Sequence, residues 1–286
     1  MNLHALAERV GHLESLDAVA ESLADLVHRA VPAKSTRKDL LSGTWLGHPL
    51  HPLLTDIPIG SFTSASVLDL IGGTRSEWAA DRLVDLGLAS SVVTAVAGAA
   101  DWSDTVGEER RMGVVHAASN AVGVALYGAS AVARRQGKRG AATVLGLGGM
   151  SVMSFGGFLG GHLSFSRGIG VNRNIGDEPG DDWAVAARVD DLTEGALLGV
   201  EIDGAPVLLH QLGEQVTAIG GRCSHAGAPL EEGDVDAGRC TVTCPWHQSV
   251  FRLDTGEVVH GPATVPQRAY DTRVVGGQIE IRPRRP

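Results

Sequence analysis

Aromatic residues are scarce in this sequence: 5 Phe, 5 Trp and 2 Tyr make up 4% of the 286 residues. Hydrophobic residues nevertheless reach 43%, and glycines number 38. A water-soluble core of that size would normally use more aromatic side chains, whereas small residues at this density suit helices packed closely in lipid. Basic tracts are also lacking, and the formal net charge is −9. Because phosphate neutralisation supplies most nucleic-acid affinity, this composition argues against a nucleic-acid partner.

Cysteine is scarce as well, and the residues that occur, Cys223, Cys240 and Cys244, are clustered. They do not suit a secreted disulfide framework, so we expect a reducing compartment or a metal site. The N-terminal stretch MNLHALAERVGHLESLD has early acidic residues and no apolar core, unlike a signal peptide. No Gly-x-Gly-x-x-Gly follows a predicted strand, which argues against a nicotinamide or flavin bound through that motif.

An apolar stripe with helical spacing runs from residue 3 to residue 30. It predicts an amphipathic N-terminal helix within residues 1–44. The opposite face is acidic, whereas a helix lying on anionic lipid would be basic. We therefore expect this helix to dock on the rest of the protein or on a partner. The stripe consists of Leu6, Val10, Leu13, Leu16, Leu23 and Val27.

Four mainly apolar segments follow, and each approaches the roughly 20 residues that crossing a bilayer requires. The fourth contains no Asp, Glu, Lys or Arg, whereas aspartates in the first two weaken those two individually. Together they predict an all-α four-helix transmembrane bundle over residues 45–166 of a multi-pass protein of the bacterial inner membrane. The segments lie at about 52–71, 83–100, 113–133 and 141–163.

If the four segments cross alternately, several polar residues meet at one membrane face. Ionisable residues in a membrane domain are candidates for function, because burying them is costly. Three interpretations stay open: interfacial histidines satisfied by headgroups and carbonyls, two axial ligands of a b-type haem, or a quinone or proton site that includes Asp56. The candidate haem or quinone residues are His51, His116 and His162, and His48 and Asp101 lie at the same face.

Two short motifs in the second half carry the clearest chemistry. Cys-x-His at 223–225 and Cys-x-x-His at 244–247 each offer one thiolate and one imidazole. Two Cys on one iron and two His on the other is the ligation of a Rieske [2Fe–2S] centre. Zinc is the competing interpretation, although zinc sites usually pair Cys with Cys and His with His. The predicted cluster ligands are Cys223, His225, Cys244 and His247.

The stretch CSHAGAPLEEGDVDAGRCTVTCPWHQSVFRLDTGEVVHGPA closely resembles the cluster-binding domain of Rieske ferredoxins, over about residues 183–286. The resemblance implies that Gly261-Pro262-Ala263 covers the cluster. Alternating runs such as WAVAARV, VLLHQL and QIEIRP independently predict an all-β domain. The turn signals between such runs are Asp203-Gly204, Asp254-Thr255-Gly256 and Gly276-Gly277.

Several positions depart from the pattern of quinol-oxidising Rieske proteins. Those proteins carry a disulfide where this chain has Ala228 and Trp246, and a Tyr where it has Phe251. Fewer hydrogen bonds to the cluster predict a lower reduction potential. Gln248 replaces the usual Gly of the family, which the sequence does not explain. Cys240 matches no ligand position, and we expect it to be a buried thiol in a strand.

The region 45–166, headed by LGHPLHPLLTDIPIG, resembles an uncharacterised family of bacterial four-span membrane domains that are sometimes fused to Rieske domains. That family implies no function. The Gly-rich polar stretch 167–182 predicts a flexible linker with a reach on the order of 20–24 Å. Such a linker would let the domain at 183–286 move between a soluble donor and the membrane.

These patterns predict an electron carrier rather than a stand-alone enzyme. We expect a soluble NAD(P)H-linked reductase or a ferredoxin to supply electrons, and a haem or quinone at the membrane histidines to accept them. The unpaired Cys240 and the lack of a twin-Arg export signal favour a cytoplasmic cluster domain. The alternative is a cluster-bearing redox sensor or assembly protein whose membrane domain is only an anchor.

Overall fold

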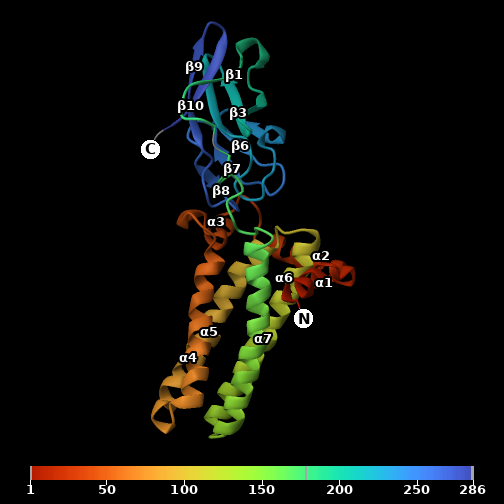
Figure 1. Ribbon diagram of the computed structural model, residues 1–286, viewed down its shortest axis with the longest axis vertical. Coiled ribbons are helices and arrows are strands. Elements are labelled where there is room, and N and C mark those ends of the chain that lie inside the picture. The colour runs from red at the N-terminus through yellow and green to blue at the C-terminus, as the bar shows by residue number, and fades with distance from the viewer. Residues whose placement is uncertain (1, 178, 285–286) are drawn as a thin grey trace. The chain divides into compact units, whose positions relative to one another are not determined.

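The computed structural model describes residues 2–177 and 179–284, which fold as two compact units (Figure 1). One unit comprises Met1–Ala30 and Leu50–Ile169, and it is helical. The other comprises Val31–Pro49 and Gly170–Pro286, and nearly all of its regular structure is β. The prediction of a helical part followed by an all-β domain is therefore confirmed.

The N-terminal segment is not the single helix that its apolar stripe predicts. Helix α1 (Leu3–Gly11) ends at His12, whose N–H bonds back to the carbonyl of Glu8, and α2 (Asp17–Ala30) follows a 3₁₀ turn at Glu14–Leu16. Leu13 leaves the helical conformation with φ −76° and ψ 70°, so the stripe is divided between two helices. The expected docking on the rest of the protein is confirmed, because Ala7 and Val10 pack against Met112 and Leu159.

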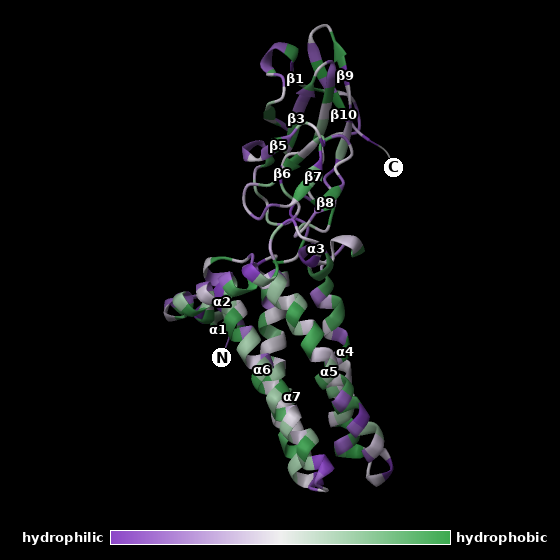
Figure 2. Ribbon diagram, turned by 180° about the vertical axis from the view of Figure 1, so that it is seen from behind, coloured by the Kyte–Doolittle hydropathy of each residue, from purple (hydrophilic) through white to green (hydrophobic). Residues whose placement is uncertain are grey.

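The four predicted apolar segments all form long helices. Two stretches, Thr74–Trp102 and Arg139–Phe165, are long and apolar enough to cross a bilayer by length and composition, and Figure 2 shows the apolar residues along them. Of the other two helices, one opens with Glu108-Glu109-Arg110-Arg111 and is the most polar of the four, and the other carries Asp56 and Asp69 within an otherwise mainly apolar run. The helices are α4 (Leu50–Ile71), α5 (Glu77–Trp102, preceded by a 3₁₀ turn at Thr74–Ser76), α6 (Gly107–Arg135) and α7 (Arg139–Phe165).

These helices associate chiefly as two hairpins, α4 with α5 and α6 with α7. Small residues permit the close packing, as glycine-rich helices in lipid commonly do. A Cβ at Gly87 would lie 2.6 Å from the ring of Phe62. The Phe62 ring in turn stacks on Tyr127 at 3.9 Å between centroids, and the Tyr127 hydroxyl lies 2.9 Å from that of Ser66. Side chains from both hairpins thus form one core.

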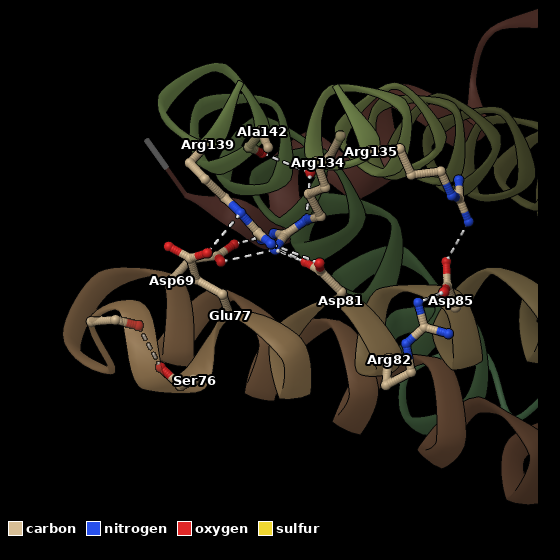
Figure 3. A network of polar contacts seen from close by, with 12 residues as sticks. Asp69, Ser76, Glu77, Asp81, Arg82, Asp85, Arg134, Arg135, Arg139 and Ala142 are labelled. Carbon is tan, nitrogen blue, oxygen red and sulfur yellow. Dashed lines mark hydrogen bonds and ion pairs between the residues drawn. The ribbon is translucent and has the colours of Figure 1, made fainter. Parts of the chain in front are cut away.

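A largely buried ion network joins all four helices at one end of the bundle, near the turns that connect α4 to α5 and α6 to α7 (Figure 3). Arg134, whose side chain is only 3% exposed, pairs with Asp69 and, at 3.1 Å, with Asp81. Arg139 donates to both oxygens of Asp81 at 2.6 and 2.7 Å. The network explains how the bundle tolerates Asp69, one of the aspartates that weakened the sequence prediction. It also places Arg134 inside the bundle, although the predicted third apolar segment ended at residue 133.

The β unit contains a six-stranded sheet in the order β1-β10-β9-β4-β3-β2 and a four-stranded sheet in the order β5-β6-β7-β8. Two of the predicted turns are confirmed by positive φ angles: 51° and 82° at Asp203-Gly204, and 57° and 78° at Gly276-Gly277. The strands are β1 (Ala184–Arg188), β2 (Leu197–Ile202), β3 (Ala205–Leu212), β4 (Gln215–Gly220), β5 (Asp234–Asp236), β6 (Thr241–Thr243), β7 (Val250–Arg252), β8 (Val258–His260), β9 (Ala269–Val275) and β10 (Gln278–Pro283).

A short helix, α3 (Thr36–Ser42), belongs to the β unit although it precedes the helical bundle in the chain. The hydroxyl of Ser35 caps its start by accepting from the N–H of Lys38. Gly43, with φ 82°, ends it in the left-handed conformation that glycine adopts without steric cost. A 3₁₀ turn at Thr44–Leu46 follows.

Candidate metal centre

The two ligand loops share one backbone design. In the first, the N–H of Cys223 donates to the carbonyl of Ala228 at 2.8 Å, and the N–H of Gly227 donates back to Cys223 at 2.9 Å. In the second, the N–H of Cys244 donates to Ser249 at 2.8 Å, and that of Gln248 donates back to Cys244 at 3.2 Å. Each loop therefore folds over its own cysteine with the same register.

The same register explains the unusual Gln248. The residue four positions after each cysteine is left-handed, with φ 85° at Gly227 and φ 60° at Gln248. Glycine adopts this conformation freely, whereas a residue with a Cβ pays a steric cost. This left-handed conformation explains why the family usually has glycine at this position. This chain keeps the same backbone conformation with a residue that is less suited to it.

The four predicted ligands come together as two like pairs. Cys223 and Cys244 are both 1% exposed, and a hydrogen bond from Cys223 lowers the pKa of the Cys244 thiol to about 7. That bond and burial raise the pKa of Cys223. The rings of His225 and His247 lie 4.9 Å apart and perpendicular, each with a buried Nδ1.

This donor set fits a [2Fe–2S] centre, which takes two thiolates on one iron and two imidazoles on the other. Cys223 and Cys244 would hold the first iron, and His225 and His247 the second. The loops rest on a buried apolar core, which restricts access of water to the thiols. That core contains Leu208, Ile219, Ala228, Leu230, Val242, Phe251, Leu253 and Ala263.

The segment after β8 is bonded to both ligand loops. The N–H of Ala263 donates to the hydroxyl of Ser249 at 2.9 Å, in the second loop. The hydroxyl of Ser224, in the first loop, donates to the carbonyl of Val265 at 2.6 Å. Residues 261–265 therefore lie over the two loops, at the place where the family resemblance predicts a covering segment.

Helix α3 and the turn after it also hold this covering segment, which the sequence did not indicate. Asp39 accepts from the N–H of Gly261 at 2.8 Å with one oxygen and from Nδ1 of His260 at 2.9 Å with the other. The hydroxyl of Thr44 donates to the carbonyl of Ala263 at 3.2 Å. No motif marks Asp39, because its partners lie more than 200 positions later and only the folded chain brings them together.

The surroundings of the loops give three further findings. The N–H of Arg173, inside the predicted linker 167–182, donates to the carbonyl of Ser224 at 3.0 Å. Cys240 is half-buried in a turn before β6 with φ 53°, so the expectation of a buried strand thiol is wrong. Desolvation raises the pKa of this thiol. Trp246 is 55% exposed beside the predicted ligand His247 and offers an aromatic surface.

In the helical unit, two of the candidate histidines meet. His51 of α4 and His116 of α6 lie 6.4 Å apart between ring centroids, with perpendicular rings. Nδ1 of His51 donates to the carbonyl of Thr94 at 2.9 Å, and Nδ1 of His116 donates to that of Gly156 at 2.7 Å. Each histidine is thus fixed by the second helix of its own hairpin.

The two hairpins repeat this device. A Cβ at Gly98, four residues after Thr94, would lie 2.7 Å from the His51 ring. A Cβ at Gly160, four residues after Gly156, would lie 2.8 Å from the His116 ring. In both hairpins, therefore, a glycine makes room for an imidazole whose Nδ1 is held by the carbonyl one turn earlier.

The remaining candidates lie elsewhere. His162 is near the other end of α7 from Arg139, and its Nε2 is 3.3 Å from Oε1 of Glu8 in α1. His48 belongs to the β unit, is exposed, and lies near the carbonyl of Pro49. The structure therefore groups His51 with His116 and separates His162 from both.

Comparison with known proteins agrees with the geometry of both parts. Residues 182–271 match the family model for the Rieske [2Fe-2S] domain, and residues 47–173 match the family described as "Predicted membrane protein (DUF2231)". The chain therefore belongs to the Rieske [2Fe–2S] family through its C-terminal domain, which follows an N-terminal domain of that membrane protein family.

Two curated relatives match the β domain. The anthranilate 1,2-dioxygenase ferredoxin subunit of Burkholderia cepacia is 33% identical over 100 residues, covering 35% of this chain and 91% of that protein. The 3-phenylpropionate/cinnamic acid dioxygenase ferredoxin subunit of Escherichia coli K12 is 41% identical over 97 residues, covering 34% and 89%. Their similarity implies that this domain transfers electrons through an iron–sulfur centre.

A solved structure matches as well. The ferredoxin of carbazole 1,9a-dioxygenase from Nocardioides aromaticivorans IC177 is 34% identical, with a TM-score of 0.34, and the match covers 36% of this chain and 98% of that one.

Proposed function

We propose that this protein is a membrane-anchored electron carrier. A soluble NAD(P)H-linked reductase or a ferredoxin reduces it on the cytoplasmic side, and a site in its own membrane domain accepts the electrons. The observation that carries the proposal is the pairing of Cys223 with Cys244 and of His225 with His247 in two matched loops. A bound [2Fe–2S] cluster supplies one-electron redox chemistry at these ligands.

The donor side of the proposal rests on the relatives and on the surface beside the ligands. The named relatives are ferredoxin subunits of dioxygenases, proteins that work with partner redox components. Exposed Trp246 next to His247 gives such a partner an apolar contact close to the iron held by imidazoles. Aromatic side chains are favoured at such contacts because they bury much area at low entropic cost.

The acceptor side rests on His51 and His116. Two half-buried imidazoles in an apolar bundle are each fixed through Nδ1 by a carbonyl, which leaves Nε2 to bind a ligand once the Asn120 amide, 3.3 Å from Nε2 of His116, has moved aside. A b-type haem or a quinone is the redox partner that this pair would take. His162 is left out of the proposed acceptor site because its partner is Glu8.

The first experiment tests the cluster. Full-length protein purified in detergent should contain two irons per chain and show the Rieske electron paramagnetic resonance signal when reduced. The variant His247→Ala should lose the signal, while Cys240→Ser, which removes the non-ligand cysteine, should keep it. A colourless, zinc-loaded protein without iron would overturn the proposal.

The second experiment tests the potential. Ala228 and Trp246 cannot form the disulfide of quinol-oxidising proteins, and buried Phe251 has no hydroxyl to donate. Voltammetry should therefore give a value near those of ferredoxins. A value near the top of the Rieske range, about +300 mV, would contradict the expected weak hydrogen bonding.

The third experiment tests the acceptor. An optical spectrum of the purified protein should show a Soret band, lost in His116→Ala, if the pair binds haem. Without that band, reduced protein should reduce an added quinone in detergent, and His51→Ala should slow that reaction. If neither occurs, the membrane domain is only an anchor and the sensor or assembly role replaces the carrier role.

The fourth experiment tests topology. We propose that all four helices α4–α7 cross the membrane, with both chain ends in the cytoplasm. Cysteines introduced at exposed Ser22 and Asp182, in a Cys240→Ser background, should be labelled by an impermeant reagent only after cell lysis. Labelling of the two sites from opposite sides would require an odd number of crossings.

A further inference from the structure

Three potential metal ligands meet where the N-terminal helix α1 packs near the C-terminal end of α7. His4 and Glu8 are one turn apart on α1, and His162 reaches them from α7. Nε2 of His162 lies 3.3 Å and Nε2 of His4 lies 4.0 Å from the same oxygen of Glu8. The ligand atoms of all three residues lie within 4.8 Å of one another.

The group is built into the fold rather than carried on loose side chains. The His162 side chain is 4% exposed. The side chain of Asn2 caps α1 by accepting from the N–H of His4. On the next turn, Ala7 and Val10 are buried in the cluster that packs α1 on the bundle. Glu8 and His162 are therefore held in place before any ligand binds.

A second layer of residues orients the carboxylate. The guanidinium of Arg167 donates to the second oxygen of Glu8 at 2.6 Å and to Glu108 at 2.8 Å. It also lies 3.5 Å from Glu109. Ligating carboxylates are usually held in this way by an outer hydrogen bond, which fixes the free oxygen toward the metal. Glu8 thus turns Oε1 toward the two imidazoles.

We propose that His4, Glu8 and His162 bind one divalent transition-metal ion of the zinc class, independently of the cluster in the β domain. Two imidazoles and one carboxylate suit Zn²⁺ or a similar ion, which then keeps a coordination position for water. Mg²⁺ and Ca²⁺ prefer all-oxygen sites and fit this set poorly.

The distances agree with one shared ion. Two ligands at bond lengths of roughly 2.0–2.2 Å in a tetrahedral site lie about 3.4 Å apart. His162 and Glu8 already have that separation, at 3.3 Å. His4 lies at 4.0 Å and its side chain is 66% exposed, so a small rotation brings it into range. The bound ion would fasten α1 to α7 through His4 and Glu8 on one side and His162 on the other.

The experiment uses full-length protein in detergent, with two irons per chain so that the cluster ligands are not available to zinc. Added Zn²⁺ should bind with a stoichiometry of one per chain, measured by metal analysis and by isothermal titration. Co²⁺ at the same site should give the visible absorption of tetrahedral nitrogen and oxygen ligation. The variants His162→Ala and Glu8→Gln should each weaken Zn²⁺ binding at least tenfold.

The matched control is His12→Ala. His12 also lies beside α1 and pairs with a carboxylate, Glu108, at 3.4 Å, but it is outside the ligand group. It should bind Zn²⁺ like the wild type. An unchanged cluster signal in every variant shows that the protein is folded. Should His162→Ala prove unstable, Arg167→Ala offers a second test, with an expected loss of about 10–100-fold.

Two outcomes would overturn the proposal. In one, the full-length protein, with its two irons in place, binds no Zn²⁺. Glu8 and His162 would then form only a hydrogen-bonded pair. In the other, His12→Ala weakens binding as much as His162→Ala, which would mean diffuse attraction of cations to the acidic surface.

Discussion

The carboxylate of Asp39 accepts a hydrogen bond from the backbone N–H of Gly261 at 2.8 Å, although 222 positions separate the two residues. The other oxygen of the same carboxylate accepts a hydrogen bond from Nδ1 of His260. Because Ala263 then bonds Ser249 in the second ligand loop, one continuous set of hydrogen bonds runs from α3 to the cysteine loop. A segment that precedes the long helices α4–α7 in the chain thus becomes part of the candidate metal centre.

Replacing Asp39 should therefore alter the cluster. Asp39→Ala removes two hydrogen bonds to a charged group, which should lower the free energy of unfolding of the β domain by about 1–3 kcal/mol. It also removes a negative charge and admits water. Both changes stabilise the reduced cluster, which carries one more negative charge than the oxidised cluster. Voltammetry should show a higher reduction potential. Asp190→Ala, whose carboxylate is 87% exposed, is the control and should leave both quantities unchanged.

Gln248→Gly should stabilise the second ligand loop. The backbone at this position has φ 60°, a conformation that costs a residue with a Cβ roughly 1–2 kcal/mol and costs glycine little. Urea unfolding should show a gain of about 1 kcal/mol. Gln248→Ala, which keeps the Cβ, should show no gain. Equal stabilisation by both variants would mean that the glutamine side chain, and not the backbone, is unfavourable.

The two neighbouring arginines at the end of α6 should differ strongly in their contribution to stability. Arg134→Leu leaves the buried carboxylate of Asp69 without its partner and should cost about 3–5 kcal/mol. Arg135→Ala breaks an exposed pair with Asp85 and should cost about 0–1 kcal/mol. Thermal unfolding of both variants in detergent measures the difference. Similar losses would show that the network of Figure 3 is not buried in solution.

The stability of the β domain should fall in mild acid because of His210. This side chain in β3 is 1% exposed, and burial lowers its pKa. The unfolded chain, with an ordinary histidine pKa of about 6.5, binds a proton that the folded chain does not. Stability contributed by neutral His210 is therefore fully present above about pH 6.5 and is lost as the pH falls toward its folded pKa.

His210→Leu removes this titration. Between pH 6.5 and 5.5 the wild type should lose up to about 1.4 kcal/mol more than the variant, the value for one proton over one pH unit. Urea midpoints at three pH values measure the slopes. The other histidines are identical in both proteins, so the difference isolates His210. Parallel slopes would contradict the expected effect.

The candidate metal centre could be proposed from local sequence chemistry. The proposed ligands Cys223, His225, Cys244 and His247 could be selected from spacing, because one Cys and one His lie within each loop and metal chemistry restricts which residues can serve. Hairpin turns were equally visible, since Asp203-Gly204 and Gly276-Gly277 supply the positive φ angles that a tight turn requires. The long helices α4–α7 followed from long, mainly apolar runs.

Long-range pairing was beyond reach of the sequence. Nothing in a one-dimensional pattern shows that Asp39 meets Gly261, that Arg134 satisfies Asp69, or that His51 faces His116, because each depends on how distant helices and loops pack. Helix packing likewise decided that His162 joins α1 instead of the other histidines. The sequence by itself determined which chemistry the chain can hold, since ligand type and spacing are local. The tertiary structure decided which residues surround that chemistry, because burial and hydrogen bonding act through space.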